Sequence, residues 1–111
     1  MQTFPHRTTP EIDVDELARL VESGSVRILD VREDWEYRRG RVPGAISLPL
    51  GRLTAQAAGL PRDKPYAVVC EHGNRSLAAT DYLLSQGFEG AASVRGGTTA
   101  WARTQRPLEK D

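Results

Sequence analysis

The spacing of apolar residues along the chain separates predicted helices from predicted strands. Asp13 stands three residues before Glu16, a pattern typical of a helix start, and apolar residues follow at helical spacing until Gly24. Further helical segments are predicted over residues 34–39, 50–60, 76–86 and 98–104. Short apolar runs predict strands over residues 26–31, 45–48, 66–70 and 91–94.

Strands alternate with helices in this prediction, which indicates an α/β domain. Such alternation is typical of parallel strands joined by right-handed crossovers, with helices on both faces of the sheet. We expect one domain over residues 11–105, with residues 1–10 and 106–111 as flexible termini. Ligands of these folds bind at the carboxyl ends of strands, where Asp30 and Cys70 both stand.

The composition excludes several classes of function. The 111 residues carry 15 basic and 15 acidic side chains, so no charged field points to nucleic acid or an anionic membrane as a partner. No segment approaches the ~18 consecutive apolar residues of a membrane span, and the first ten residues lack the apolar stretch of a signal peptide. Cys70 is the single cysteine, which excludes an intramolecular disulfide and favours a reducing compartment. We therefore expect a cytoplasmic protein.

The segment CEHGNRS, residues 70–76, places this cysteine at a strand end, on a polar loop that leads into a helix. Backbone N–H groups of such a loop form a concave anion site, and the helix dipole adds positive potential. Arg75 contributes a fixed charge, and Gly73 lets the loop turn so that its amides converge. These surroundings favour a thiolate nucleophile. The alternative is a buried structural cysteine, but the apolar run ends at Cys70, which favours the reactive interpretation.

The loop neighbours of Cys70 argue against other chemistries. His72 follows two residues later, where the two side chains diverge, so a solvent-facing histidine is favoured over a Cys/His dyad. We expect Glu71 to point to solvent, because a carboxylate next to a thiolate is unfavourable. Cys70, His72 and the distant His6 lack the paired spacing of a zinc site, so we predict no metal. No phosphate-loop or dinucleotide motif is present, so we predict no cofactor.

Three motifs, taken in order, resemble the signatures of the rhodanese sulfurtransferases. LDVREDWEYRRGRVPGAISLP (29–49) is similar to the first signature, CEHGNRS to the active-site loop and GGTTAW (96–101) to the terminal signature. The resemblance covers nearly the whole chain between Glu11 and Trp101. It implies a three-layer α/β/α fold with a mostly parallel five-stranded sheet. It also implies that Cys70 carries sulfur as a persulfide within a substrate-binding loop of Glu71, His72, Gly73, Asn74, Arg75 and Ser76.

The length of the loop bears on the reaction. Four residues separate Cys70 from Arg75. Phosphatases and arsenate reductases related to the rhodanese family have one residue more, and a wider ring suits a tetrahedral oxyanion. The narrower ring suits a single terminal sulfur, so sulfur transfer is favoured over phosphate hydrolysis or arsenate reduction. A non-catalytic docking or redox-sensing module is the other alternative, although the sequence contains no second cysteine to resolve a sulfenic acid.

Residues outside the loop are assigned supporting roles. Asp30 is expected to hydrogen-bond the loop amides or Arg75 and so hold the loop open, with simple packing as the alternative. Arg41 stands where the family commonly has histidine. It is either a tolerated surface exchange or an extra charge near the pocket rim that favours anionic donors. Arg32 and Glu36 are expected to pair with each other or to contact solvent.

The resemblance and the thiolate environment together predict a two-step transfer. Cys70 attacks the outer sulfur of a sulfane donor such as thiosulfate, holds it as a persulfide and passes it to cyanide or a thiol. Thiosulfate, polysulfide, glutathione persulfide and the persulfide of a cysteine desulfurase are all compatible donors. Small donor and acceptor molecules are therefore the expected partners, and a sulfur-relay protein is a further alternative.

Overall fold

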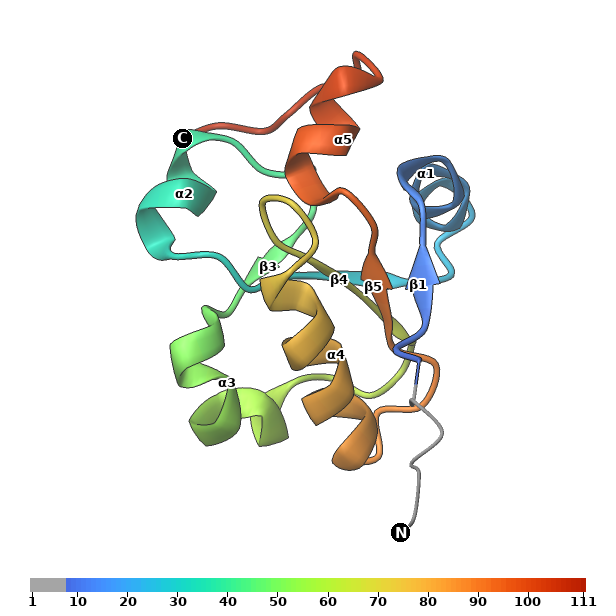
Figure 1. The fold of residues 1–111 in the computed structure, drawn as a ribbon, viewed down its shortest axis with the longest axis vertical. Coiled ribbons are helices and arrows are strands. Elements are labelled where there is room, and N and C mark those ends of the chain that lie inside the picture. Colours follow the sequence, from blue (N-terminus) through green and yellow to red (C-terminus); the bar gives the residue numbers. More distant parts are fainter. Residues whose placement is uncertain (1–7) are drawn as a thin grey trace, which may run out of the picture.

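The computed structural model describes residues 8–111, so most of the predicted N-terminal segment 1–10 lies outside it. Five strands form one sheet in the order β1-β5-β4-β2-β3, and every neighbouring pair is parallel (Figure 1). The strands are β1 Glu11–Ile12, β2 Arg27–Asp30, β3 Ile46–Ser47, β4 Tyr66–Val69 and β5 Ala92–Val94. The expectation of a mostly parallel five-stranded sheet is confirmed.

The apolar pattern predicts four of these strands and misses β1. This strand has two residues, too few for any alternation to show. It is held at the edge of the sheet by backbone bonds, in which the Ser93 amide donates to the Pro10 carbonyl and the Arg95 amide donates to the Ile12 carbonyl. The short edge strand is therefore specified by its neighbour β5 and not by its own residues.

The helices follow the predicted segments closely. They are α1 Val14–Glu22, α2 Asp34–Arg39, α3 Leu50–Gln56, α4 Arg75–Ser85 and α5 Gly97–Arg103. Asp13 caps α1, because its side chain accepts a hydrogen bond of 2.8 Å from the Glu16 amide. The segment predicted as one helix over 50–60 is divided, since α3 gives way to a short 3₁₀ helix, η1 Ala57–Gly59. Gly59 is the last residue of η1, and Pro61 lies two residues beyond it, where its ring cannot continue a helix.

Side chains alternate between the two faces of the sheet, and each face has its own apolar core. The core beneath α3 and α4 contains the strand residues Leu29, Val31, Val68 and Cys70. The core beneath α1 and α5 contains Ile28, Ala67, Val69 and Val94. Helices therefore cover both faces, which confirms the three-layer arrangement (Figure 1). Cys70 belongs to the α3/α4 face.

The C-terminal segment 106–111 is packed against the domain, unlike the loose tail expected from its sequence. The buried Trp101 ring explains part of this contact, because its Nε1–H donates to the Pro107 carbonyl at 2.9 Å. Arg106 Nη2 donates to Asp15 at 2.9 Å, and Glu109 pairs with Arg41 as an isolated antiparallel bridge. Within residues 8–111, no helix combines the length and the apolar character needed to span a bilayer.

Candidate active site

Cys70 directly follows β4, and the loop after it folds back over its sulfur. The residue is 1% exposed. Its Sγ accepts hydrogen bonds from the amides of Gly73 at 3.1 Å and Ser76 at 3.3 Å. The second donor belongs to the first turn of α4, where backbone N–H groups point out of the helix and the helix dipole is positive. The loop and the helix therefore hold the sulfur as a hydrogen-bond acceptor.

Two buried hydroxyl groups lie next to the sulfur. Ser76 Oγ is 3.4 Å from Cys70 Sγ and 2.8 Å from Ser93 Oγ, and both serines are fully buried. The Ser76 hydroxyl therefore lies between the sulfur and the Ser93 hydroxyl, in a short buried chain of groups that can both donate and accept hydrogen bonds.

Sequence reasoning missed Ser93, although a signal for it exists. It is a polar residue between Ala92 and Val94 in a strand that is otherwise apolar. A buried hydroxyl in such a position needs a partner from the element packed on it, here α4.

Further amides of the loop are available to a ligand. Four backbone N–H groups of the loop donate to no acceptor within residues 8–111, namely those of Glu71, His72, Asn74 and Arg75. Converging amides of this kind bind anions. The side chains of His72 and Asn74 are exposed, so they leave the interior of the loop to the backbone. The arrangement suits a small anionic group bound next to Cys70.

Two glycines allow the loop to lie against α5. Gly73 has a φ of +101°, and a Cβ there would lie 3.1 Å from the Gly96 nitrogen. A Cβ on Gly97 would overlap the carbonyl oxygen of Cys70 and come within 2.6 Å of that of Glu71. This close approach lets the first turn of α5 bind the loop, because the Thr98 amide donates to the Cys70 carbonyl at 2.9 Å. The sequence indicates a turn at Gly73, but it gives no sign of the contact between Gly97 and the loop.

Arg75 ends the loop in an ion pair with Glu36 of α2. Its Nη1 and Nη2 atoms donate to the two carboxylate oxygens at 2.7 and 2.9 Å. Hydrogen bonding from Arg75 lowers the pKa of Glu36 to about 2, and the same bond raises the pKa of Arg75. The expected pairing of Glu36 with Arg32 is wrong. Arg75 is thus directed at α2 and fixes the end of the loop through that helix.

Asp30 pairs with Arg32, and its expected contact with the loop amides or Arg75 is also wrong. Its carboxylate accepts from Arg32 Nη2 at 2.8 Å and Nε at 3.0 Å, and both side chains are buried. The pleat of the sheet explains the error. Asp30 is in register with Val69, so it faces the α1/α5 side, whereas Cys70 faces the α3/α4 side.

Arg32 connects this buried pair to the loop through Glu71. Its Nη1 donates to Glu71 at 3.3 Å, and the hydroxyls of Thr98 and Thr99 donate to the same carboxylate at 3.4 and 3.3 Å. Glu71 therefore does not simply point to solvent, as its sequence position suggests. Its charge is bound on the α5 side of the sheet, away from the face that contains the sulfur.

Comparison of the sequence with known proteins identifies the family of this chain. The profile of the rhodanese-like domain matches residues 13–104. The chain belongs to the rhodanese-like family. A sulfurtransferase from Allochromatium vinosum is 34% identical over 99 residues, which cover 88% of this chain and 92% of the relative. The thiosulfate sulfurtransferase GlpE of Shewanella oneidensis is 35% identical over 101 residues, which cover 91% of this chain and 95% of the relative.

Solved rhodanese structures have the same fold. A rhodanese-related protein from Thermoplasma volcanium has a TM-score of 0.83 at 34% identity, covering 92% of this chain and 99% of that one. A thiosulfate sulfurtransferase from Pseudomonas aeruginosa also has a TM-score of 0.83, at 31% identity, and covers 92% of this chain and 20% of that longer chain. The similarity extends over the whole rhodanese-like domain described here.

Arg41, where this chain departs from the common rhodanese pattern, does not reach the pocket. Its guanidinium lies 4.3 Å from the centre of the Tyr37 ring and pairs with Glu109 and Asp111 at 3.3 and 2.8 Å. The idea of an extra charge at the rim is therefore wrong. Arg41 instead anchors the C-terminal segment.

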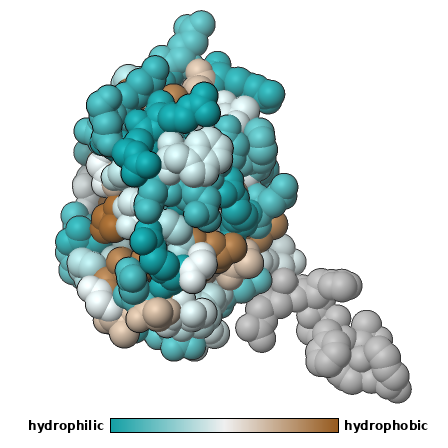
Figure 2. Space-filling view, turned by 90° about the vertical axis from the view of Figure 1, so that its left-hand side faces the viewer, coloured by the Kyte–Doolittle hydropathy of each residue, from teal (hydrophilic) through white to brown (hydrophobic). Residues whose placement is uncertain are grey.

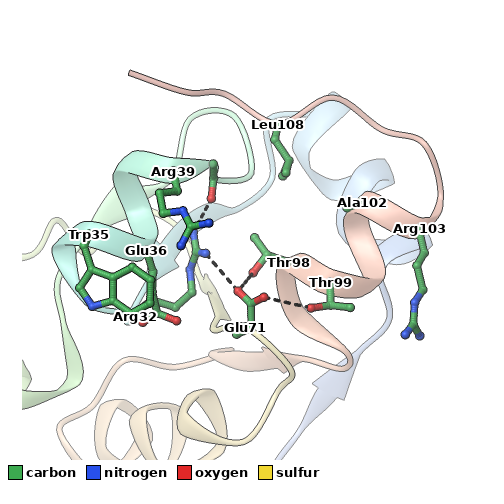
Figure 3. Close-up of a pocket in the computed structure, with 11 residues that line it drawn as sticks. Arg32, Trp35, Glu36, Arg39, Glu71, Thr98, Thr99, Ala102, Arg103 and Leu108 are labelled. Carbon is green, nitrogen blue, oxygen red and sulfur yellow. Dashed lines mark hydrogen bonds and ion pairs between the residues drawn. The ribbon is translucent and has the colours of Figure 1, made fainter.

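A pocket of about 740 Å³ borders the rhodanese loop, between α2 and α5 (Figure 3). Glu71 lies near its centre, and Trp35 and Thr99 lie on opposite sides of it. Among residues 8–111 there is no group of three or more His, Cys, Asp or Glu side chains arranged to hold a metal ion.

Proposed function

We propose that this protein is a sulfurtransferase in which Cys70 carries sulfane sulfur from a small donor to a nucleophilic acceptor. The observation that carries the proposal is the environment of Sγ. It accepts two amide hydrogen bonds, and four more loop amides have no protein acceptor among the described residues. Relatives of similar length are named sulfurtransferases. A reducing compartment such as the cytoplasm would keep the thiol of Cys70 free for this reaction.

In the first step the Cys70 thiolate attacks the outer sulfur of thiosulfate. The sulfur–sulfur bond of thiosulfate breaks as the new one forms, and its electron pair leaves with sulfite. The charge of the thiolate moves to the outer sulfur of the persulfide. Free amides of the loop stabilise this anion where it develops, next to the positive end of α4. Thiosulfate is the proposed donor because a relative of 35% identity is named for it and its two charges suit an amide-lined site.

In the second step a nucleophile takes the outer sulfur. Cyanide attacks it, the persulfide bond breaks, and thiocyanate leaves while the electron pair returns to Cys70 as a thiolate. A thiol acceptor reacts in the same way and becomes a persulfide. The Ser76 hydroxyl and the amides of Gly73 and Ser76 hold the returning thiolate, so the resting and final states share one set of hydrogen bonds.

The geometry gives less support to phosphate or arsenate chemistry. A phosphoryl group would need a guanidinium directed at its oxygens, but that of Arg75 is bound by both oxygens of Glu36. Cys70 is also only 1% exposed, which suits attack on a single terminal atom better than on a tetrahedral centre.

The test is intact-protein mass spectrometry after incubation with thiosulfate. Since Cys70 is the single cysteine, we expect the wild-type chain to gain one sulfur atom and Cys70→Ser to gain none. Cyanide should remove the added sulfur and release an equal amount of thiocyanate. Absence of loading from thiosulfate, polysulfide and a desulfurase persulfide would overturn the proposal. Hydrolysis of an aryl phosphate would then indicate a phosphatase, and its absence a docking or redox-sensing module.

A further inference from the structure

Ser93 carries a hydroxyl into the interior between β5 and α4. Polar side chains gather at the surface of this protein, as the hydrophilic upper part of the side that carries α2 shows (Figure 2). Ser93 is instead fully buried, in the middle of β5 between Ala92 and Val94. It is in register with Val68, which belongs to the same α3/α4 core as Cys70. The pleat of the sheet therefore directs the Ser93 hydroxyl to the face that holds the sulfur.

A single side chain separates this hydroxyl from the sulfur. Ser76 Oγ lies 2.8 Å from Ser93 Oγ and 3.4 Å from Cys70 Sγ, and Ser76 is fully buried as well. Among residues 8–111, Ser76 is the one hydrogen-bond partner of the Ser93 hydroxyl. An effect of Ser93 on the sulfur therefore passes through Ser76.

Loss of the Cys70 proton sets the direction of both contacts. A thiolate can only accept hydrogen bonds, so the Ser76 hydroxyl donates to Sγ, and the Ser76 oxygen is then an acceptor for Ser93. Without Ser93 the Ser76 hydroxyl is free to turn, because a serine in a helix can donate instead to a backbone carbonyl of the preceding turn. Hydrogen bonds in a buried chain also strengthen one another. Ser93 therefore holds the Ser76 hydroxyl toward the sulfur.

Charged groups around Cys70 are the other influence on its ionisation. At this end of the sheet, the charged or titratable side chains on the elements around Cys70 are Asp30 and Arg32 at the end of β2, Glu71 and His72 of the loop, Arg75 of α4 and Arg52 of α3. Hydrogen bonding to Glu36 is the main cause that raises the pKa of Arg75, and the charge of Cys70 raises it further. All of these groups stay the same in a variant of Ser93. A difference in the ionisation of Cys70 between such variants therefore reports the hydroxyl.

We propose that Ser93 is a positioning residue of the transfer, which acts through Ser76 to hold the Cys70 sulfur as an anion. The inference rests on the proposed sulfurtransferase function. In that reaction the thiol proton leaves to solvent and the thiolate gives an electron pair to the outer sulfur of thiosulfate. Sulfite then departs with the electron pair of the broken sulfur–sulfur bond. A larger fraction of thiolate at a given pH makes this step faster.

The first test measures the ionisation of Cys70 without any sulfur donor. Because Cys70 is the single cysteine, the ultraviolet absorbance of its thiolate can be followed against pH, with Cys70→Ser as the blank. In Ser93→Ala the midpoint of this titration should move to higher pH by about 0.5–1. Ser93→Thr keeps a hydroxyl at this position and should restore the wild-type midpoint.

Thr80→Val is the matched control for this titration. Thr80 also carries a buried hydroxyl on α4, but that hydroxyl has no hydrogen-bond partner in the described part of the chain. Its removal should leave the midpoint at the wild-type value. A serine with a merely structural role would lower the free energy of unfolding in Ser93→Ala and leave the midpoint unmoved, and that result would overturn the proposal.

A cycle of variants tests whether Ser93 acts through Ser76. The midpoint in Ser76→Ala should rise at least as far as in Ser93→Ala. Adding Ser93→Ala to Ser76→Ala should move it no further, because the hydroxyl that Ser93 holds is already gone. Shifts that added up in the double variant would show that Ser93 acts by another route, against the proposal.

Sulfur loading separates this inference from the proposed function. At a pH below the wild-type midpoint, thiosulfate should load Ser93→Ala about threefold to tenfold more slowly than the wild type. The difference should shrink above both midpoints, where both proteins are ionised. If Cys70 took up no sulfur while the titration pattern held, Ser93 would keep its effect on the thiolate and the transfer would fall. Equal loading rates below the midpoint, in a protein that does take up sulfur, would refute the positioning role.

Discussion

Glu36 joins α2 to the end of the Cys70 loop by holding Arg75 with both carboxylate oxygens, at 2.7 and 2.9 Å. The same carboxylate accepts a hydrogen bond of 2.9 Å from the Glu33 amide at the start of α2. No side chain of α2 is fully buried, so packing alone does not fix this short helix. One glutamate therefore orders both the helix and the end of the loop.

Acid should weaken the ion pair between Glu36 and Arg75 over a range of pH that follows from the pKa of Glu36. Pairing lowers the pKa of Glu36 from 4.5 to about 2, so the pair stabilises the fold fully above pH 4.5 and loses this effect as the pH falls towards 2. We expect Glu36→Gln to lower the free energy of unfolding by about 1–2 kcal/mol near neutral pH, because partial exposure of Arg75 screens the pair. Urea unfolding at a series of pH values should show this difference shrinking below pH 4.5.

Glu89→Gln serves as the control for that titration, because Glu89 is exposed and its side chain has no hydrogen-bond or ion-pair partner within residues 8–111. Its difference from the wild type should be small at every pH. If Glu36→Gln lowered the free energy of unfolding by the same amount in acid as at neutral pH, the effect could not be assigned to the ion pair.

Arg32 should matter more for stability than any surface arginine. Its removal in Arg32→Met leaves the carboxylate of Asp30, which is fully buried, without its partner, and we expect a loss of about 3–5 kcal/mol in the free energy of unfolding. The double variant Asp30→Asn, Arg32→Met removes the stranded charge and should recover part of that loss. Equilibrium unfolding of the four proteins in this cycle measures the coupling. If the loss in the double variant equalled the sum of the losses in the two single variants, Asp30 and Arg32 would not be coupled and the prediction would be contradicted.

Local features of the site could be predicted from the sequence, and its long-range pairings could not. The order of strand, glycine-containing loop and helix around Cys70 lies within a few consecutive residues, so the pattern alone indicates it. Glu36 and Arg75 are 39 residues apart, and many other carboxylates could have reached the same guanidinium. The pairing depends on the positions that α2 and the loop take in the folded protein, which no local pattern of residues gives.

The position of Asp30 shows a second limit. The sequence places Asp30 at the carboxyl end of a strand, as the structure does, but the face of the sheet that it occupies depends on the register of β2 against β4. A shift of one residue would have put Asp30 on the same face as the sulfur. Apolar runs such as VRILDV and YAVVC are buried on both faces and contain no alternation from which register could be inferred.

The contact between α5 and the loop should make Gly97 intolerant of any side chain. Gly97→Ala would place a methyl group against the carbonyls of Cys70 and Glu71 at a φ of +59°, and we expect a loss of at least about 3 kcal/mol in the free energy of unfolding. Gly51→Ala is the control, because a Cβ there meets nothing within 4 Å and lies in α3. It should stabilise the protein by about 0.5–1 kcal/mol. Thermal unfolding of both variants tests the contrast, and a Gly97→Ala protein as stable as the wild type would refute it.

Two buried hydroxyls one turn apart on α4 should respond in opposite ways to removal. Thr80 Oγ1 is buried and has no hydrogen-bond partner in the described part of the chain, so Thr80→Val should raise the free energy of unfolding by about 1 kcal/mol. Ser76 Oγ contacts both Cys70 and Ser93, so Ser76→Ala leaves the Ser93 hydroxyl without a partner and should lower the free energy of unfolding by about 1–2 kcal/mol.

Sulfur loading provides the second readout, because of these two hydroxyls only that of Ser76 contacts Cys70 Sγ. Loading should slow by about tenfold in Ser76→Ala and keep its wild-type rate in Thr80→Val. Equal effects of the two substitutions on loading would mean that the serine hydroxyl does not act on the sulfur.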